Sequence, residues 1–365
     1  MKNQEKIFVI GHKNPDTDSI CSAIAYCDIK NRTTQESRYI PKRAGQINEE
    51  TEYVLNRFGV HPPGYLSNIG TQVKDMDIRL SPEANKSMSL KNAWDLMQEN
   101  SIVSLPIREK DGTLEGLITI GDIAKTYMDT TDSYLLSRAR TQYQRIAETI
   151  GGKVIEGNAH GYFIQGKIMV ATANPDKMKE YVEENDMVIM GNREEDHLQA
   201  IEQNVSCIIV GMGIEVTEKV LKLAHEKDIV IISSPYDTFT ISRLINQSIP
   251  VKYIMKTDNL VTFNTEDFTD DIQEVMIKHR HRAFPVINKK GKCIGTISRR
   301  NFLDMHRKKV VLVDHNEKDQ AVDNIDKAEI MEIIDHHKLG TLQTMQPISF
   351  RNQPVGCTGT IMYQM

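Results

Sequence analysis

Residues 10–19 have the sequence Ile10-Gly11-His12-Lys13-Asn14-Pro15-Asp16-Thr17-Asp18-Ser19. The apolar run from Ile7 to Ile10 predicts a buried strand, and the mostly small residues from Ser19 to Ala25 predict a packed helix. One imidazole and two carboxylates therefore follow a strand and precede a helix. Such side chains are typical ligands of a divalent metal ion, so this stretch is half of a metal site and needs ligands from elsewhere.

Two further clusters of acidic and histidine residues lie near the end of the sequence. The apolar run from Val310 to Val313 predicts a buried strand that ends at Asp314. A predicted helix then leads to a second strand, Ala328 to Ile334, which ends at Asp335-His336-His337. The stretch from Gly356 to Thr360 predicts the start of another helix.

The alternation of strands and helices at both ends of the chain predicts one parallel sheet. Ligands of such sheets bind beyond the carboxyl ends of the strands, so we expect the clusters to meet at one edge. Asp16 and Asp18 alone are more often part of a turn and a helix cap, but the clusters together indicate a functional site. Mixed histidine and carboxylate ligands favour manganese or cobalt over magnesium. The candidate residues are His12, Asp16, Asp18, Asp314, His336 and His337.

Residues 73–128 and 251–308 repeat one another. Each copy has a Val-Lys pair, an amphipathic helix, a strand that contains a proline, a charged turn and a final Gly-x-x-Thr/Ser-x-x-Asp/Asn motif. The two prolines, Pro106 and Pro285, are 179 residues apart, as are the two motif glycines, and this matched offset indicates a duplication. The motif residues are Gly116, Thr119 and Asp122 in the first copy and Gly295, Ser298 and Asn301 in the second.

A separate small α/β unit is predicted between the copies, at about residues 130–245. Arg138 to Thr149 predicts one helix that Gly151-Gly152 ends, and Val216 to His225 predicts another. Four short apolar runs predict buried strands at 168–171, 187–190, 207–210 and 229–232.

The composition narrows the possible partners. The formal net charge of −5 argues against a general nucleic-acid binder, because no excess of basic residues is available to neutralise phosphates. No apolar run approaches the roughly 20 residues of a membrane helix, so we expect no membrane partner. Five scattered cysteines, and a start without a signal-type apolar region, predict a cytoplasmic protein with reduced thiols.

The motifs Gly-His-x-Asn-Pro-Asp-x-Asp, Val-Asp-His-Asn and Asp-His-His resemble those of the DHH phosphoesterase superfamily, in detail those of the family II inorganic pyrophosphatases. The duplicate resembles a pair of CBS domains. The block between resembles a DRTGG domain, although the literal Asp-Arg-Thr-Gly-Gly signature is absent. The resemblance implies an α/β fold in which a tandem CBS pair and a small DRTGG-like α/β domain interrupt a parallel-sheet DHH domain. The implied parts are 1–70 and 309–365 for the DHH domain, 71–128 and 248–308 for the CBS domains, and 129–247 for the DRTGG-like domain.

The resemblance also implies an activity, the hydrolysis of diphosphate to two phosphates at a two-metal site. Mn²⁺ or Co²⁺ would occupy the site, with Mg²⁺ accompanying the substrate, and His337 would contact the substrate phosphate. The implied ligand sets are His12, Asp16 and Asp314 for one metal, and Asp18, Asp314 and His336 for the other.

The resemblance to a CBS pair implies control by adenine nucleotides and a homodimer. AMP or ADP would inhibit and ATP would activate, and diadenosine polyphosphates are further candidate regulators. The threonine hydroxyl and aspartate carboxylate of the motif suit phosphate and ribose groups, whereas Phe284 is as typical of a core residue as of a side chain that stacks on adenine. The alternative is a structural spacer. The candidate nucleotide-binding residues are Thr119, Asp122, Val261, Phe284, Ser298 and Asn301.

The sequence departs from the family pattern in one respect. The family has a further metal-binding aspartate after Asp-His-His and a C-terminal domain with a cluster of lysines and arginines, and we find neither. We therefore expect a chain truncated at Met365, with weak metal binding and little activity. The alternative functions are another DHH phosphoesterase, acting on oligonucleotides or cyclic dinucleotides, and a non-catalytic nucleotide-sensing module.

Overall fold

A computed structural model describes residues 6–35, 37–128, 132–172, 175–303 and 305–365. The predicted first residue of the DRTGG-like domain, residue 129, lies outside these ranges. The chain divides into two compact units. The first contains Met1–Ile78, Asn264–Arg280 and Arg299–Met365, and the second contains Arg79–Phe263 and His281–Ser298. Among the described residues, no helix is both long and apolar enough to cross a membrane.

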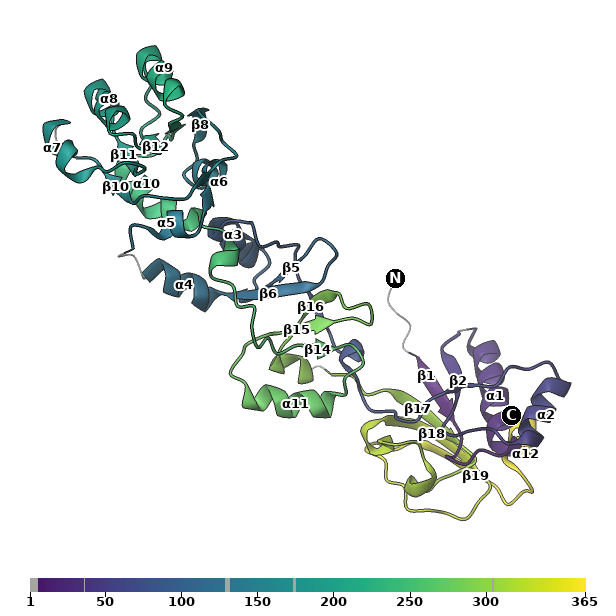
Figure 1. The fold of residues 1–365 in the computed structure, drawn as a ribbon. Helices are drawn as coiled ribbons and strands as arrows, with labels where there is room; N and C mark the ends of the chain where they lie inside the picture. The colour runs from purple at the N-terminus through teal and green to yellow at the C-terminus, as the bar shows by residue number, and fades with distance from the viewer. Residues whose placement is uncertain (1–5, 36, 129–131, 173–174, 304) are drawn as a thin grey trace. The chain divides into compact units, whose positions relative to one another are not determined.

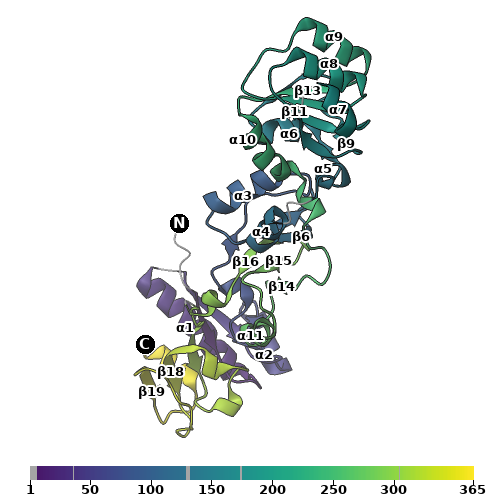
Figure 2. The same cartoon turned by 90° about the vertical axis from the view of Figure 1, so that its left-hand side faces the viewer.

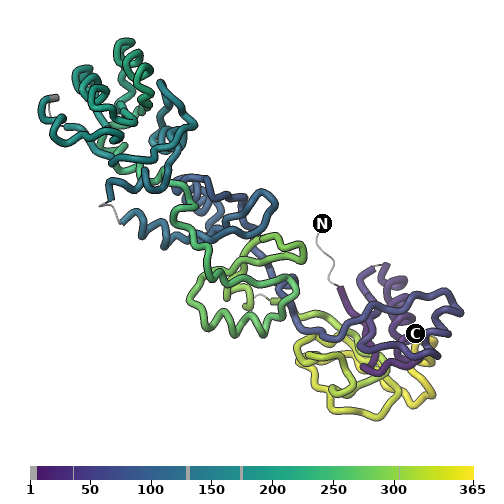
Figure 3. The backbone as a smooth tube through the Cα atoms, in the orientation of Figure 1, coloured from purple at the N-terminus to yellow at the C-terminus, as the bar shows by residue number. Residues whose placement is uncertain are grey.

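The first unit is built on a six-stranded sheet in which every pair of neighbours is parallel. Figures 1 and 3 show its N-terminal part, in purple, and its C-terminal part, in yellow, side by side, and Ile7 pairs with Lys309. The prediction of one parallel sheet from the two ends of the chain is confirmed. The strands, in sheet order, are β19 (Ser349–Asn352), β18 (Glu329–Asp335), β17 (Lys309–Val313), β1 (Ile7–Ile10), β2 (Tyr39–Arg43) and β3 (Gly64–Tyr65).

The two faces of this sheet are covered differently. Val311 and Val313 of β17 pack with side chains of α1 (Thr17–Thr34) and α12 (Thr358–Tyr363). The alternate residues of β17 pack on the other face with side chains from residues 321–330. The connection between β17 and β18 forms two short 3₁₀ turns, at Lys318–Gln320 and Ile325–Lys327. The helix predicted before β18 is therefore wrong, because Asn324 takes a left-handed conformation (φ 61°) that interrupts helical backbone. The first unit also contains α2 (Glu49–Arg57).

Lys308 joins two chain segments of the first unit just before β17. Its Nζ donates to the carbonyl oxygen of Gly70 at 2.9 Å and lies 3.0 Å from Asp75 Oδ2. The lysine side chain is only 14% exposed. This contact therefore fixes the segment in which the first repeat begins to the segment in which the second repeat ends.

The two repeats have the predicted order of elements. In the first, a 3₁₀ turn at Val73–Asp75 precedes α3 (Leu90–Glu99) and the hairpin of β5 (Ser104–Arg108) and β6 (Leu114–Thr119), and α4 (Ile120–Met128) follows. In the second, a 3₁₀ turn at Val251–Tyr253 precedes β14 (Phe263–Asn264), α11 (Thr269–Lys278) and the hairpin of β15 (Phe284–Ile287) and β16 (Cys293–Ile297). Strand β16 also pairs with β4 (Arg79–Leu80). The copies differ at their ends, where a 3₁₀ turn at Arg299–Phe302 replaces the counterpart of α4.

The middle block contains a five-stranded sheet with helices on both faces. Its four predicted strands are confirmed, and they are parallel, with β8 added antiparallel at one edge. Figure 2 shows α7, α8 and α9 together over this sheet. The strands are β8 (Lys153–Glu156), β10 (Ile168–Val170), β11 (Met187–Met190), β12 (Cys207–Val210) and β13 (Val230–Ser233), and the helices are α6 (Tyr143–Thr149), α7 (Pro175–Tyr181), α8 (Glu194–Glu202), α9 (Glu218–Glu226) and α10 (Thr238–Leu244).

The single helix predicted over Arg138 to Thr149 is wrong. Two helices, α5 (Leu135–Arg138) and α6, are separated by the short strand β7 (Thr141–Gln142), which pairs with β9 (Tyr162–Phe163). Arg140 has a left-handed conformation with φ 51°, which ends helical backbone.

Candidate metal centre

The predicted metal ligands meet at one edge of the six-stranded sheet. Strands β1, β17 and β18 are neighbours and run parallel, and the loops at their carboxyl ends carry His12, Asp314 and His336 in turn. Asp314 lies at the centre of the group. Its Oδ2 is 3.3 Å from His12 Nε2, and its Oδ1 is 3.4 Å from His336 Nε2. Segments far apart in the sequence therefore contribute to one site.

Asp314 is a buried carboxylate in an unusual environment. It is 1% exposed and has a left-handed backbone conformation, with φ 64°. Its Oδ1 accepts a hydrogen bond from Thr358 Oγ1 at 2.9 Å, whereas its Oδ2 is buried without a hydrogen-bond partner. An unpaired buried carboxylate oxygen is energetically costly, so the site calls for a further group of positive charge.

The orientation of His336 points to the same conclusion. Its Nδ1 lies 3.0 Å from the carbonyl oxygen of Val355, and this hydrogen bond requires the hydrogen on Nδ1. In a neutral ring, Nε2 then carries the lone pair, and this atom faces Asp314 and Asp18, whose Oδ2 is 3.8 Å away. A nitrogen lone pair repels carboxylate oxygens unless a cation lies between them. The residues therefore fit a divalent metal ion.

Two groups of side chains place ligand atoms close enough to share a cation. In each group, the ligand atoms all lie within 4.8 Å of one another. One group is His12, Asp16 and Asp314, and the other is Asp314, His336 and His337. Asp314 belongs to both.

Asp16 and Asp18 also stabilise helix starts. Asp16 is the N-cap of α1, and its Oδ1 accepts a hydrogen bond from Ser19 N at 2.9 Å and lies 3.8 Å from His12 Nε2. Asp18 accepts hydrogen bonds from the backbone nitrogens of Thr358 (2.7 Å) and Gly359 (2.8 Å). The cap and the metal-site interpretations of these carboxylates are therefore compatible.

The protonation of His12 and Asp314 reflects burial and mutual charge. Burial raises the pKa of Asp314, and the nearby charge of Asp18 adds to this, while contacts with His12 and Thr358 partly offset it. Burial alone would lower the pKa of His12, but the carboxylates of Asp314, Asp16 and Asp18 outweigh it and raise that pKa. A cation that binds here therefore competes with protons.

Several residues of the site were not assigned by sequence reasoning. Thr358 contacts both Asp314 and Asp18, although its segment was recognised only as a helix start. His315 is fully buried, and burial lowers its pKa to about 4. Asp335 and Asn316, also buried, belong to motifs that the sequence displays, but no local pattern predicts their contacts.

The six candidate nucleotide-binding residues are divided between the two compact units. Five of them belong to the second unit, and Asn301 belongs to the first. Thr119 Oγ1 donates to Asp122 Oδ2 at 2.6 Å, and Lys256 Nζ lies 3.4 Å from Asp122 Oδ1. Phe284 is fully buried against Phe263 and His281, so its ring is part of the core here, and a stacking role stays a prediction. Val261 and Ser298 are half-buried.

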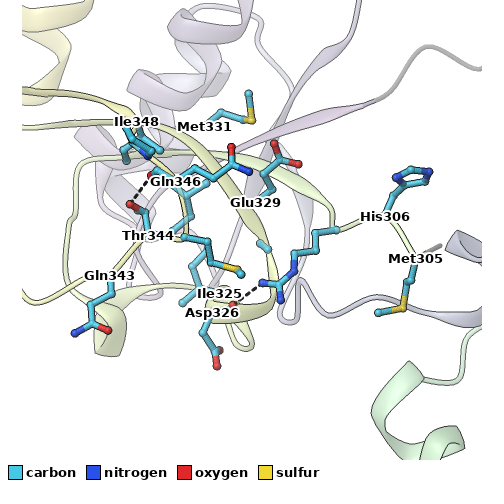
Figure 4. A pocket seen from close by; sticks show the side chains of 15 residues that line it. Met305, His306, Ile325, Asp326, Glu329, Met331, Gln343, Thr344, Gln346 and Ile348 are labelled. Carbon is cyan, nitrogen blue, oxygen red and sulfur yellow. Dashed lines mark hydrogen bonds between the residues drawn. The ribbon is translucent and has the colours of Figure 1, made fainter. Parts of the chain in front are cut away.

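Two pockets lie away from the metal centre. One, of about 380 Å³, is lined by Glu329 and Met331 at the start of β18 and by residues 343–348 (Figure 4). In Figure 4 a dashed line marks the hydrogen bond from Thr344 Oγ1 to the carbonyl oxygen of Gln346, at 2.9 Å. Because Asp335 ends the same strand, the pocket lies about 20 Å from the ligands. The other, of about 300 Å³, is mainly apolar and lies in the second unit beside Trp94 and Tyr127.

Comparison with known proteins identifies related families and relatives. The CBS domain family matches residues 78–129 and 251–308, and the DRTGG domain family matches residues 145–248. The cobalt-dependent inorganic pyrophosphatase of Clostridium perfringens is 39% identical over 98% of this chain. A probable manganese-dependent inorganic pyrophosphatase of Thermotoga maritima is 33% identical over 99% of this chain. The chain spans 65% and 66% of the length of these two relatives.

A solved structure covers the regulatory part. It is the crystal structure of the CBS and DRTGG domains of the regulatory region of Clostridium perfringens pyrophosphatase, complexed with the activator diadenosine tetraphosphate. It is 34% identical, with a TM-score of 0.60, and the match covers 63% of this chain and all of that one. The chain therefore belongs to the proteins that carry CBS domains and a DRTGG domain, and its homologues along the full chain are named inorganic pyrophosphatases.

Proposed function

We propose that the chain contributes the metal centre of an inorganic pyrophosphatase of the DHH phosphoesterase type, which hydrolyses diphosphate to two phosphates. The observation that carries the proposal is the position of Asp314. Its buried carboxylate lies between the Nε2 atoms of two histidines, and its Oδ2 has no hydrogen-bond partner. The names of the two relatives support the same substrate and a requirement for cobalt or manganese.

The residues would hold two cations, Mn²⁺ or Co²⁺, with Mg²⁺ accompanying the substrate. Bound there, the cations would supply a water of lowered pKa and would offset charge on the phosphoryl group. Asp314 would serve both cations, and Thr358 would keep its carboxylate oriented. His337, whose side chain is half exposed, would contact the substrate phosphate. The ligand sets are His12, Asp16 and Asp314 for one cation, and Asp18, Asp314 and His336 for the other.

The proposed regulation uses the CBS pair and the DRTGG domain. The regulatory region of the Clostridium perfringens enzyme was solved with a diadenosine tetraphosphate activator, which supports binding of adenine nucleotides or diadenosine polyphosphates here. Thr119 and Asp122 present a hydroxyl and a carboxylate that suit ribose and phosphate groups. A homodimer formed through the CBS domains and a cytoplasmic location complete the proposal.

Metal binding provides the primary test. Calorimetric titration of the metal-free protein with Mn²⁺ is expected to show two cations per chain, and Asp314→Asn is expected to abolish both, because both ligand sets include Asp314. Asp319→Asn, at an exposed carboxylate of the same unit, is the matched control. A wild-type chain that binds no cation, or an Asp314→Asn chain that binds both, would contradict the proposal.

Substrate choice is tested by following phosphate release from pyrophosphate and cleavage of a cyclic dinucleotide in parallel. We expect pyrophosphate to be the substrate. Cleavage of the cyclic dinucleotide with inert pyrophosphate would favour another phosphoesterase. Nucleotide binding without any metal-dependent turnover would favour a sensing module.

A further inference from the structure

Asp335, the last residue of β18, is fully buried and has both carboxylate oxygens engaged. Its Oδ1 accepts hydrogen bonds from the backbone nitrogens of His336 (2.8 Å) and His337 (3.2 Å), and lies 2.8 Å from His337 Nδ1. Its Oδ2 accepts a hydrogen bond from Asn316 Nδ2. Asp335 belongs to neither of the two groups of ligand atoms at the metal centre, so its burial needs another explanation.

Asn316 belongs to the loop after β17 and is 5% exposed. Its Nδ2 also donates to the carbonyl oxygen of Lys338 at 3.0 Å, and its Oδ1 accepts a hydrogen bond from Gly340 N. These contacts fix the orientation of the carboxamide, because a flipped amide would lose them and would place an oxygen against Asp335. A side chain at Gly340 would put its Cβ 2.6 Å from Asn316 Oδ1, so the loop can approach this closely only with glycine.

The two side chains therefore connect the loop that carries Asp314 to the loop that carries both histidines. Because Asp335 only accepts hydrogen bonds, its contact with His337 requires the hydrogen on Nδ1. The other ring nitrogen, Nε2, is left outside this contact, on a side chain that is half exposed. Asn352 Nδ2 fixes the backbone of the same residue by donating to the His337 carbonyl oxygen at 2.8 Å.

We propose that Asp335 and Asn316 are positioning residues that hold His337 in the tautomer with its hydrogen on Nδ1, which leaves Nε2 as the ring nitrogen available to the substrate. Neither binds a cation itself. This inference rests on the proposed function for the identity of the substrate, but the tautomer is a property of the metal-free protein. Buried carboxylates commonly orient histidines beside metal ions in this way.

The test compares Asp335→Asn, the double variant D335N/N316D and the control Asp326→Asn, an exposed carboxylate beside Lys318. In Asp335→Asn the new amide group faces the amide nitrogen of Asn316, so two hydrogen-bond donors meet. In the double variant, residue 335 supplies the donor and residue 316 the acceptor. Nitrogen NMR of ¹⁵N-histidine-labelled, metal-free protein reports which ring nitrogen carries hydrogen, and His337→Gln assigns the signal. We expect the Nδ1–H signal of His337 in the wild type and the control, its loss in Asp335→Asn and its return in the double variant.

Cobalt absorption titrations give a second readout. We expect Asp335→Asn to bind the wild-type number of cobalt ions with about 10- to 100-fold lower affinity, as for other residues that orient ligands. Loss of one cobalt ion would make Asp335 a ligand and overturn the inference, as would an unchanged His337 tautomer. If Asp335→Asn does not fold, Asn316→Ala serves instead, with hydrogen exchange at His337 Nδ1 expected to be about tenfold faster. A wild type that binds no cation would refute the proposed function, while the NMR result would still decide the inference.

Discussion

The start of α1 can lie this close to the end of β1 only because residue 11 is a glycine. A Cβ at Gly11 would lie 1.9 Å from Ser19 Oγ, and 3.1 Å from Ser19 Cβ and from its carbonyl oxygen. Ser19 is fully buried, and its Oγ accepts a hydrogen bond from His12 N at 3.1 Å. Gly11→Ala must therefore displace the hydroxyl and break the hydrogen bond that fixes the backbone of His12, the first of the proposed metal ligands.

The expected cost follows from these contacts. Loss of the hydrogen bond costs about 1 kcal/mol, and overpacking of the buried site adds about 2 kcal/mol. The lower entropy of the unfolded alanine chain returns about 0.7 kcal/mol. The net destabilisation of the first unit is about 2 kcal/mol, which corresponds to a roughly 30-fold change in the opening equilibrium.

Hydrogen exchange followed by mass spectrometry measures this effect within one unit. We expect exchange in peptides covering β1 and the start of α1 to be about 30-fold faster in Gly11→Ala, with β11–β13 unchanged. Adding Ser19→Ala removes the nearest atom, so the double variant should lose less than the sum of the single changes. Gly356→Ala, where an added Cβ meets nothing within 4 Å, is the control. Unchanged exchange in β1, or strictly additive effects, would refute the steric argument.

Three further predictions concern the metal centre and the junction. Asp314→Asn should abolish the Co²⁺ absorption bands, because both proposed ligand sets include the Asp314 carboxylate, whereas Asp319→Asn should retain them. If the bands of one bound cobalt ion stayed at full strength in Asp314→Asn, the two ligand sets would not share Asp314. Cation affinity should fall as the pH is lowered from about 8 to about 6, because the raised pKa of His12 lets protons compete there; Mn²⁺ titrations with a constant affinity would contradict this. Lys308→Met should speed hydrogen exchange in residues 70–76 about tenfold, because it removes a half-buried ion pair and a hydrogen bond. Lys318→Met, at an exposed lysine, should leave this exchange unchanged. Equal effects of the two substitutions would count against the contact.

The sequence predicted the features that depend on the spacing of apolar residues and on the order of strands and helices along the chain. The apolar runs at Ile7 and Val310 located two central strands, and the rule that parallel strands end at one edge brought Asp314 between His12 and His336. The duplication was recognisable because its landmarks share one offset. Boundaries that depend on a single backbone conformation, such as the break at Arg140, were not predictable from helical periodicity.

The rest of the site depends on contacts that have no local signal. Thr358, Asn316 and Asp335 contribute through hydrogen bonds between loops that are distant in sequence, and such contacts are specified by the folded sheet. The split of the nucleotide candidates between the two units was equally unpredictable, because both copies carry the motif and only the fold distinguishes their surroundings.

The pairing of Ile7 with Lys309 has a consequence for synthesis in the cell. A ribosome that has just released the first strand must polymerise roughly 300 more residues before β17, its neighbour on one side, exists, and contacts of such long range form slowly. The nascent N-terminal segment, with its exposed valine and isoleucine side chains, therefore waits for its partner while the intervening repeats and middle block emerge. Chaperone dependence should accordingly concentrate in the first residues of the chain, where an unpaired strand edge stays open longest.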